Sequence, residues 1–323
     1  MKKKIIAAVV CAAVVICGVA LVNKKEYSRT EYMLNTVITI TANDKDAVAE
    51  CFNEIRRIEN LLSAYLPNSE VSAINSAPYG TPVKVSEETF ALIKKAEEYR
   101  VLTDGAFDIT IKPVADLWDV SGEGYVPTDD ELNEKLSLVA PIILDEENLT
   151  VTLPIDGMAI DLGGIAKGYA GDRIREILAS HGVKSAIADL GGNIVTVGKN
   201  RNKPWKIGIQ DPSAPRGTVC AYIDIEDKFV VTSGGYERYF EKDGQTYHHI
   251  FDPTTGRNPE NNVLSVTVVS DDCTLADALS TACFVAGKDK ALELAEKCGV
   301  EIVVCTTDGI FSTNNINIHT EEK

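Results

Sequence analysis

The sequence predicts a single α+β unit over residues 26–323, with a mixed or antiparallel sheet and flanking helices, preceded by an apolar helix at the N-terminus. Helix-like and strand-like segments alternate irregularly, which is not the pattern of a regular doubly wound fold. Several strand-like runs follow one another directly, as strands joined in hairpins do. No repeat, linker or low-complexity stretch divides residues 26–323, and about 300 residues can bury one full core.

The charge of the chain is strongly acidic. Its 323 residues include 32 lysines and arginines against 48 aspartates and glutamates, so the net charge is −16. Nucleic-acid binding needs a basic surface, and we therefore expect none. With 45% hydrophobic and 25% charged residues, the composition also excludes a disordered chain and a polytopic membrane protein.

The N-terminal region contains an uncharged run, residues 5–22, rich in alanine and valine and flanked by lysines. A helix of about 17–25 apolar residues spans a bilayer, so we expect residues 1–25 to form a membrane anchor or a signal segment. A retained anchor would hold the remainder on the extracytoplasmic face of the membrane. Cleavage near Ala20 and lipidation of Cys17 are the alternatives, and both also place the body outside the cytoplasm.

The N-terminal half of the body is predicted to contain a strand and three helices. The strand is expected over residues 32–42, which are rich in β-branched side chains, and an amphipathic helix over residues 44–62. Ser86 is expected to cap the next helix, because a serine side chain binds the free N–H groups of a first turn. A third helix is expected over residues 165–181, ending at Gly182.

The C-terminal half is predicted to contain strands and two adjacent helices. The helices are expected over residues 274–286 and Lys288–Cys298, the second ending at Gly299. Asp308 and Gly309 are expected to form the turn of a terminal hairpin. The strands expected in this half are residues 186–190, 205–209, 221–225, 263–269, Glu301–Thr306 and 310–313.

Many common catalytic motifs are absent from the sequence. It has four histidines and no G-x-S-x-G, H-E-x-x-H, G-x-G-x-x-G or P-loop motif. Beyond the apolar run the cysteines are spread singly, without zinc-like spacing. For several of them, at apolar positions of expected helices or strands, we expect buried thiols, with disulfides as the open alternative. The cysteines beyond the apolar run are Cys51, Cys220, Cys273, Cys283, Cys298 and Cys305.

Residues 163–168, with the sequence GGIAKG, place a glycine turn, a lysine and a helix start together. Glycines let the backbone approach an anion, a helix N-terminus offers free N–H groups, and Lys167 adds positive charge. The pattern is compatible with phosphate binding. A tight turn into an ordinary amphipathic helix is the alternative.

Two further clusters combine polar and aromatic side chains. Residues 103–110 (TDGAFDIT) hold two acids, a glycine and a phenylalanine, and could equally form a plain turn. Residues 248–256 (HHIFDPTTG) join two histidines to an Asp-Pro turn. A histidine there could act as a general base, bind a metal, or only be bonded to the backbone.

Asp277 and Thr281 are four residues apart on a predicted helix, so their side-chain oxygens face the same way. Asp277 could also complete a capping box with Thr274, a purely structural role worth about 1 kcal/mol. From the spacing alone, the capping box is the favoured interpretation.

Taken together, eight segments of the chain resemble the ApbE family of FAD:protein FMN transferases. No single segment is decisive, but they occur in the family's order and cover residues 30–313. The segments are residues 62–75 (LSAYLPNSEVSAIN), 104–110 (DGAFDIT), 161–170 (DLGGIAKGYA), 189–193 (DLGGN), 205–212 (WKIGIQDP), 232–239 (TSGGYERY), 249–256 (HIFDPTTG) and 276–282 (ADALSTA).

The resemblance implies a fold and a reaction. Family members are single α+β units that hold the flavin in a central cleft. With Mg²⁺ they transfer FMN from FAD to a threonine or serine hydroxyl of an acceptor protein, through a phosphoester bond, and release AMP. The usual acceptors are extracytoplasmic electron-transfer proteins. Some members instead hydrolyse FAD to FMN and AMP, and a surface flavin-binding protein without turnover is a further alternative.

The resemblance also implies roles for individual residues. His249 is implied as the base for the acceptor hydroxyl, and Asp277 as a catalytic metal ligand beside Thr281 and the Gly164 carbonyl. At residues 34–36 this chain has Leu-Asn-Thr where family members often have Met-Gly-Thr. The implied FAD-binding positions are Leu34, Tyr65, Ala106, Phe107, Asp108, Asp161, Lys167 and Ile250.

The chemistry of this reaction agrees with these residue types. Splitting a pyrophosphate needs a hard cation with oxygen ligands on the phosphates and a positive group for the developing charge. Asp277, Thr281 and a glycine-turn carbonyl are such oxygen ligands, and Lys167 is such a positive group. Because the body of the chain is acidic, this local charge has to outweigh the long-range repulsion of FAD.

Overall fold

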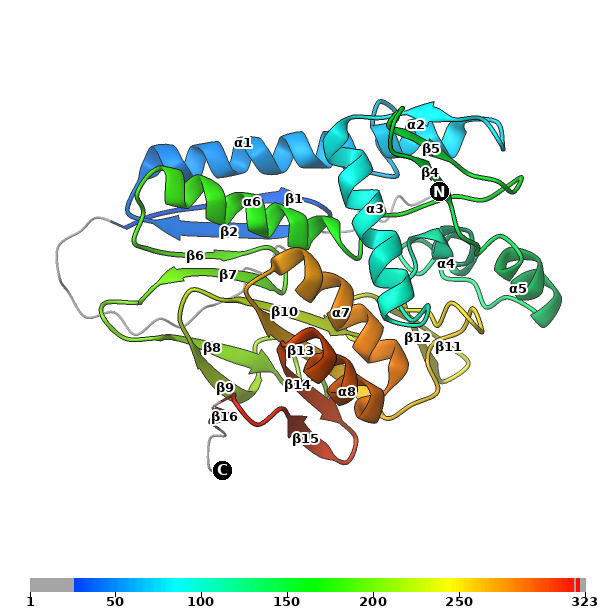
Figure 1. Ribbon diagram of the computed structural model, residues 1–323. Helices are drawn as coiled ribbons and strands as arrows, with labels where there is room; N and C mark the ends of the chain where they lie inside the picture. Colours follow the sequence, from blue (N-terminus) through cyan, green and yellow to red (C-terminus); the bar gives the residue numbers. More distant parts are fainter. Residues whose placement is uncertain (1–25, 317, 320–323) are drawn as a thin grey trace, which may run out of the picture.

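An eight-stranded sheet forms the middle of the computed structural model (Figure 1). Every neighbouring pair in it is antiparallel, so the sheet predicted as mixed or antiparallel is antiparallel. In spatial order its strands are β1 (Tyr27–Met33), β2 (Thr36–Ala42), β6 (Ser185–Asp189), β7 (Asn193–Gly198), β10 (Phe229–Gly234), β13 (Val263–Ser270), β14 (Glu301–Thr306) and β15 (Gly309–Ser312).

The structure describes residues 26–316 and 318–319. The predicted apolar helix, residues 5–22, lies outside the described residues. Within the described part of the chain, no helix has the length and apolar character needed to cross a membrane.

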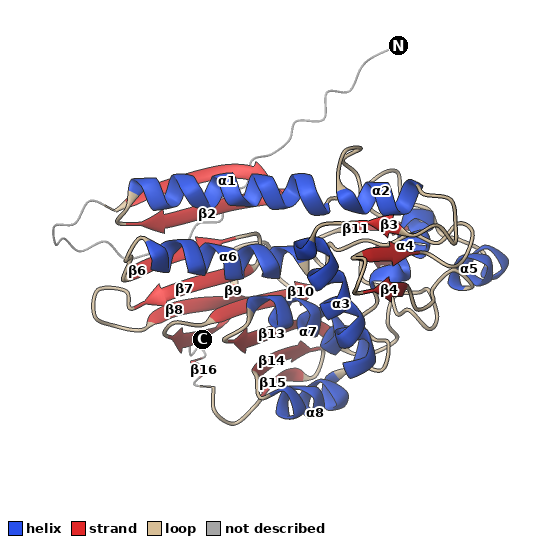
Figure 2. Cartoon of the chain, turned by 45° about the horizontal axis from the view of Figure 1, so that its top comes forward, coloured by secondary structure: helices blue, strands red, loops and turns tan. Residues whose placement is uncertain are grey.

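A layer of helices covers one face of the large sheet (Figures 1 and 2). Phe52 and Ile55 are fully buried on the first of these helices, as the predicted amphipathic pattern requires. Another helix, α3 (Glu87–Leu102), packs against α7 (Cys273–Ala286). The helices of the layer are α1 (Lys45–Leu62), α6 (Ala166–Ser180), α7 (Cys273–Ala286) and α8 (Lys288–Cys298).

The opposite face of the large sheet is covered by a three-stranded sheet, β16 (Ile318–His319), β9 (Val219–Ile225) and β8 (Trp205–Gln210). A second apolar core lies between the two sheets, where Ile223 of β9 packs with Val230 and Val303 of the large sheet. The fold is therefore a helical layer, a large sheet and a small sheet, which confirms the predicted α+β class.

Shorter elements gather at one end of these layers, beyond the ends of α1 and α6 (Figures 1 and 2). The Trp118 indole stacks on Phe251, with 5.4 Å between ring centroids, and donates a hydrogen bond to the Gly256 carbonyl. The Asp-Pro turn is thereby fixed to this end. The elements are α2 (Glu70–Ser76), β3 (Val83–Lys84), η1 (Ile109–Ile111), α4 (Lys112–Trp118), α5 (Asp129–Leu136), β4 (Ile143–Asp145), β5 (Thr150–Thr152), β11 (Tyr239–Lys242) and β12 (Gln245–His248).

The expectation of one strand over residues 32–42 was wrong, because these residues contain the turn of a hairpin. Leu34 and Asn35 both have positive φ, 50° and 57°, and β1 and β2 pair on either side of them. Such a turn usually carries glycine at its second central position, where this chain has Asn35. Other predicted elements match closely: Ser86 caps α3 by accepting from the Thr89 N–H, and α6 ends before Gly182.

The six described cysteines are free thiols, as expected. Four of them, Cys51, Cys273, Cys283 and Cys305, are buried in the cores. Burial raises the pKa of the Cys51 and Cys283 thiols to about 12, which makes both inert at neutral pH. Cys51 and Cys283 therefore act as small apolar side chains.

Candidate active site

The candidate site is built where the first turns of α6 lie against α7. Gly168 permits this contact, because a Cβ on it would lie 2.4 Å from the Cys273 carbonyl oxygen and 2.7 Å from the Asp277 Cβ. No larger residue fits there without moving a helix. The two predicted motifs, residues 161–170 and 276–282, are thus brought side by side from distant parts of the chain.

Asp277 points its carboxylate at the start of α6. Its side chain is 4% exposed, and its Oδ2 accepts a 2.8 Å hydrogen bond from the Gly168 N–H. Its Oδ1 lies 3.6 Å from the Lys167 Nζ. This carboxylate therefore has one oxygen bound to the backbone and the other beside the lysine.

The capping box of Asp277 with Thr274 was a wrong expectation. The helix begins one residue earlier than predicted, and Asp272 is its N-cap, accepting from the Leu275 N–H. The Thr274 hydroxyl instead donates to Asp172. The structure thus leaves Asp277 free of the structural role that the spacing favoured.

Thr281 follows Asp277 by about one turn of α7, as the spacing predicted. A Cβ on Gly164 would lie 3.9 Å from the Thr281 Oγ1 and 3.1 Å from the Phe107 ring. The glycine turn therefore lies against both the hydroxyl of α7 and a buried aromatic ring. The three implied metal-binding residues, Gly164, Asp277 and Thr281, are brought together.

The oxygen donors fit a hard cation. Asp277 offers a carboxylate, Thr281 a hydroxyl and Gly164 a main-chain carbonyl, which is the donor type that Mg²⁺ prefers. Mg²⁺ is usually bound by one or two carboxylates together with substrate phosphates, so a single carboxylate is sufficient. Among residues 26–316 and 318–319, no three His, Cys, Asp or Glu side chains cluster as a soft or zinc-like metal site would require.

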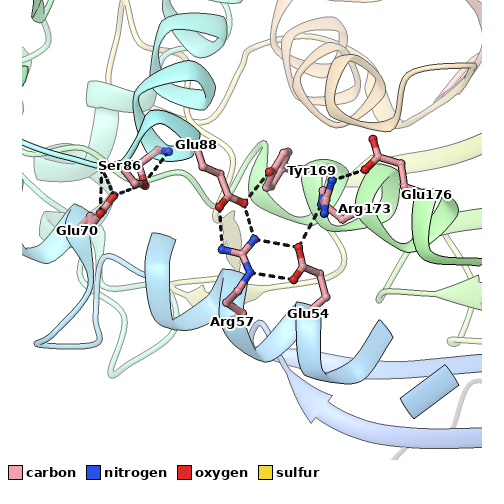
Figure 3. A network of polar contacts seen from close by, with 9 residues as sticks. Glu54, Arg57, Glu70, Ser86, Glu88, Tyr169, Arg173 and Glu176 are labelled. Carbon is pink, nitrogen blue, oxygen red and sulfur yellow. Dashed lines mark hydrogen bonds and ion pairs between the residues drawn. The ribbon is translucent and has the colours of Figure 1, made fainter. Parts of the chain in front are cut away.

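A polar network fixes the start of α6 to α1 and α3. Figure 3 shows Arg57 between Glu54 and Glu88, with Tyr169 and Arg173 of α6 reaching these two carboxylates. The Tyr169 hydroxyl donates to Glu88 at 2.6 Å. Hydrogen bonds from Arg57 lower the pKa of both Glu54 and Glu88, so the network is charged at neutral pH. Tyr169 is two residues from Lys167, so this network fixes the part of α6 from which Lys167 extends.

Tyr65 presents an aromatic ring at the surface beside the glycine turn. Its hydroxyl donates to Asp161 Oδ2 at 2.9 Å, while Asp161 Oδ1 accepts from the Gly163 N–H at 2.8 Å. The residue is 72% exposed, and the Lys112 Nζ lies 4.6 Å from the ring centroid. An exposed ring that is fixed at one end is suited to stacking against a flat ligand.

Residues 106–108 form a buried turn that packs under this surface. The Phe107 N–H donates to the Thr103 hydroxyl, and Asp108 accepts from both the N–H and the hydroxyl of Thr110. Burial raises the pKa of the Asp108 carboxyl. The Asp161 N–H donates to the Ile109 carbonyl at 2.9 Å, which joins this turn to the glycine turn. Ala106 closes the turn by donating its N–H to the Thr103 carbonyl.

His249 is held in one tautomer. Its Nδ1 lies 3.2 Å from the Arg238 carbonyl oxygen, and since a carbonyl only accepts, Nδ1 carries the proton and Nε2 is the basic nitrogen. Burial, then the charge of Arg238 and more weakly that of Lys167, lower the pKa of His249 to about 3. The imidazole is therefore neutral at physiological pH.

His248 is the histidine that is bonded to the backbone, which was one of the alternatives that the sequence left open. Its Nδ1 accepts from the Ile250 N–H at 3.2 Å, and burial lowers its pKa to about 4. Ile250 is itself buried, and its carbonyl accepts from Asn258. Of the two histidines, His249 is the better candidate for a base.

No described hydrogen bond joins Leu34 to the other implied positions. It lies in the β1–β2 turn, where its N–H donates to Glu59 in the last turns of α1. That places it at the end of α1 that leads to Tyr65.

The sequence assigned no role to Ser233, Ser280 or Arg238. Ser233 bridges to Ser280 and Thr281 of α7, and Arg238 holds His249. Ser233 and Arg238 both lie in the segment 232–239, and Ser280 lies in the segment 276–282. The family resemblance therefore included the segments that contain these residues, but it implied no role for them. Two cavities, of 380 and 340 Å³, lie elsewhere, and neither is lined by an implied site residue.

The fold is that of solved ApbE flavin transferases. The ApbE protein of Thermotoga maritima superposes with a TM-score of 0.82 and 36% identity, over 92% of this chain and 97% of that chain. The flavin transferase ApbE of Vibrio cholerae superposes with a TM-score of 0.79 and 30% identity, over 90% and 96%. A Klebsiella pneumoniae protein named FAD:protein FMN transferase is 36% identical, over 92% of each chain.

The sequence also matches the model of a whole protein family. The family model described as the ApbE family matches residues 34–304. This chain belongs to the ApbE family.

Proposed function

We propose that this protein transfers FMN from FAD to a threonine or serine hydroxyl of an acceptor protein, with Mg²⁺, and releases AMP. Relatives that align over most of the chain carry the name FAD:protein FMN transferase. The observation that carries the proposal is that Asp277, Thr281 and Lys167 lie together at the glycine turn. Cleavage of a pyrophosphate needs oxygen ligands for a cation and a positive side chain, and these residues supply both.

The proposed reaction is a substitution at phosphorus. The acceptor hydroxyl oxygen forms a bond to the phosphorus of the FMN half of FAD, and the bond from this phosphorus to the bridging oxygen breaks. AMP leaves with the bridging oxygen, and the hydroxyl proton passes to the His249 Nε2. Atoms and charge balance without an oxidant or a further reactant.

The residues of the chain contribute binding and charge stabilisation. Asp277, Thr281 and the Gly164 carbonyl would hold the cation, and Mg²⁺ would neutralise phosphate charge when bound. Lys167 lies where it can stabilise the charge of the leaving phosphate. Tyr65 would stack on one of the flat rings of FAD, and Phe107 supports the turn from below.

Two other functions compete with this proposal: an FAD pyrophosphatase and a flavin-binding protein without turnover. Incubation of the purified chain with FAD, Mg²⁺ and a candidate acceptor peptide, followed by chromatography, distinguishes them. Transfer yields AMP and peptide-bound flavin. AMP with free FMN supports the hydrolase, and unchanged FAD supports the binding protein.

For the location, we infer that residues 1–25 anchor the protein to the extracytoplasmic face of the membrane and that the acceptor is an extracytoplasmic electron-transfer flavoprotein. The support is the lysine-flanked apolar run at residues 5–22. The full chain is expected in the membrane fraction and to be released by detergent but not by carbonate. Recovery of a soluble mature form beginning near Leu21 would contradict the anchor.

A further inference from the structure

A chain of three hydroxyl groups connects β10 to the cation-binding side of α7. Ser233, near the end of β10, has its Oγ 2.8 Å from the Ser280 Oγ and 3.3 Å from the Thr281 Oγ1. The Ser280 hydroxyl in turn donates to the Asp277 carbonyl at 2.8 Å. Ser280 is fully buried, so its proton has no access to water.

The direction of each proton follows from the last member of this chain. A carbonyl oxygen only accepts, so the Ser280 hydroxyl donates its single proton in the hydrogen bond to the Asp277 carbonyl oxygen. In the contact between the two serines, Ser233 must therefore be the donor. Because the Ser233 hydroxyl already donates its one proton to Ser280, it can only accept a hydrogen bond from the Thr281 hydroxyl. The order of donation is Thr281 to Ser233, Ser233 to Ser280, and Ser280 to the Asp277 carbonyl.

This order matters for a hydroxyl that binds a cation. A ligating hydroxyl has to turn its lone pairs to the metal and its proton elsewhere, and groups that orient a ligand in this way tune its affinity. A threonine in a helix otherwise donates readily to the carbonyl four residues before it. For Thr281 that is the Asp277 carbonyl, which already accepts from Ser280. The Thr281 proton is thus directed to Ser233.

We infer that Ser233 is a positioning residue, which accepts the hydrogen bond of the Thr281 hydroxyl and so aims the Thr281 lone pairs at the cation. The inference rests on the proposed function, because it assumes the cation site of Asp277 and Thr281. Ser233 is well placed for this task, since its backbone is fixed by pairing of β10 with β13. Its role is indirect, and it acts only through Thr281.

The strand offers a matched control. Thr232 precedes Ser233, and neighbouring side chains point to opposite faces of a strand. The Thr232 hydroxyl is bonded to Thr267 at 2.9 Å. Thr232→Val therefore removes a hydroxyl and its bond from the same strand while leaving the chain of Ser233 intact.

The experiment is a titration of the purified full chain with Mn²⁺, followed by the electron paramagnetic resonance signal of the free ion. Ser233→Ala is expected to weaken Mn²⁺ binding by about tenfold or more, in the range seen for groups that orient metal ligands. Ser233→Thr, which keeps the hydroxyl, should restore much of the affinity, and Thr232→Val should bind like the wild type. Thermal unfolding without metal checks that each variant is folded, and Ser233→Cys replaces Ser233→Ala if the latter does not fold.

The outcomes separate this inference from the proposed function. If the wild type binds Mn²⁺, Asp277→Asn does not, and Ser233→Ala binds like the wild type, the role of Ser233 is wrong while the cation site stands. If Asp277→Asn binds as tightly as the wild type, or the wild type does not bind, the cation site itself is wrong and the inference is overturned with it.

Discussion

The Gly168 N–H donates to the Asp277 carboxylate at 2.8 Å, and this bond joins two helices through residues that are 109 positions apart in the sequence. The same glycine leaves no room for a Cβ, which would lie 2.7 Å from the Asp277 Cβ. One residue therefore supplies both the close approach of α6 to α7 and a hydrogen bond to the proposed metal ligand.

Gly168→Ala is expected to damage both the fold and the site. The added methyl group has to push α6 away from α7, and overpacking of this kind costs about 1–3 kcal/mol. Urea unfolding measures this loss, and the Mn²⁺ titration measures the displaced carboxylate. An unchanged free energy of unfolding together with wild-type Mn²⁺ affinity would show that the helices can separate without consequence.

Asp277→Asn tests the metal role of the carboxylate. The amide keeps the shape and an oxygen that can accept from Gly168, so we expect a stability change of about 1 kcal/mol or less. Losing the anionic oxygen should weaken Mg²⁺ binding and slow AMP release by about two orders of magnitude. AMP is quantified by chromatography across a range of Mg²⁺ concentrations, and wild-type rates at low Mg²⁺ would refute the role.

Thr281→Val removes the second side-chain oxygen at nearly constant volume. If both oxygens serve one cation, its effect on AMP release should be large and should not add to that of Asp277→Asn in the double variant. The double-mutant cycle is measured with the same assay. Strictly additive effects would mean that the two side chains act at separate sites.

His249 makes stability depend on pH in a defined direction. An unfolded histidine has a pKa of about 6.5, whereas burial lowers that of His249 to about 3. Between these values the unfolded state binds more protons, so the contribution of His249 to stability is lost as the pH falls. The free energy of unfolding of the wild type should therefore decline relative to His249→Gln from pH 7 to pH 4. A constant difference between the two proteins would contradict the lowered pKa.

The network around Arg57 is expected to stabilise the fold above the carboxylate pKa values. Because Arg57 lowers the pKa of Glu54 and Glu88 below their ordinary values, its contribution is present near neutral pH and is lost as the pH falls through those lowered values. Arg57→Met should cost about 1 kcal/mol at pH 7, since the pairs are partly exposed, and less near pH 3. Lys94→Met is the control, because it breaks an isolated and exposed pair with Glu146.

Local features of the fold could be predicted from the sequence, whereas long-range contacts could not. Ser86 at a helix start and the apolar face of α1 depend on neighbouring residues, and both were correct. The Leu34-Asn35 turn was missed because it has positive φ without a glycine. The predicted capping box was wrong because α7 begins one residue earlier, with Asp272 as its N-cap. Thr274 therefore lies inside the helix and donates to Asp172.

The candidate site also depends on long-range contacts that the sequence alone does not predict. No local pattern joins Tyr65 to Asp161 or Gly168 to Asp277, which only the folded chain brings together. The family resemblance supplied these residues, since their spacing alone favoured plain turns and a cap. It did not supply Ser233, because a hydroxyl that acts through another hydroxyl has no signature in the sequence.

The most direct test of the account is the mass of an acceptor after reaction. A candidate acceptor peptide is incubated with the full chain, FAD and Mg²⁺, and analysed by mass spectrometry together with the AMP released. We predict that the peptide gains one FMN, less one water, on a threonine or serine, with an equal amount of AMP, and that Asp277→Asn lowers the rate of both by about two orders of magnitude. AMP accompanied by free FMN and an unmodified peptide, with every acceptor tried, would contradict the transferase and establish a hydrolase instead.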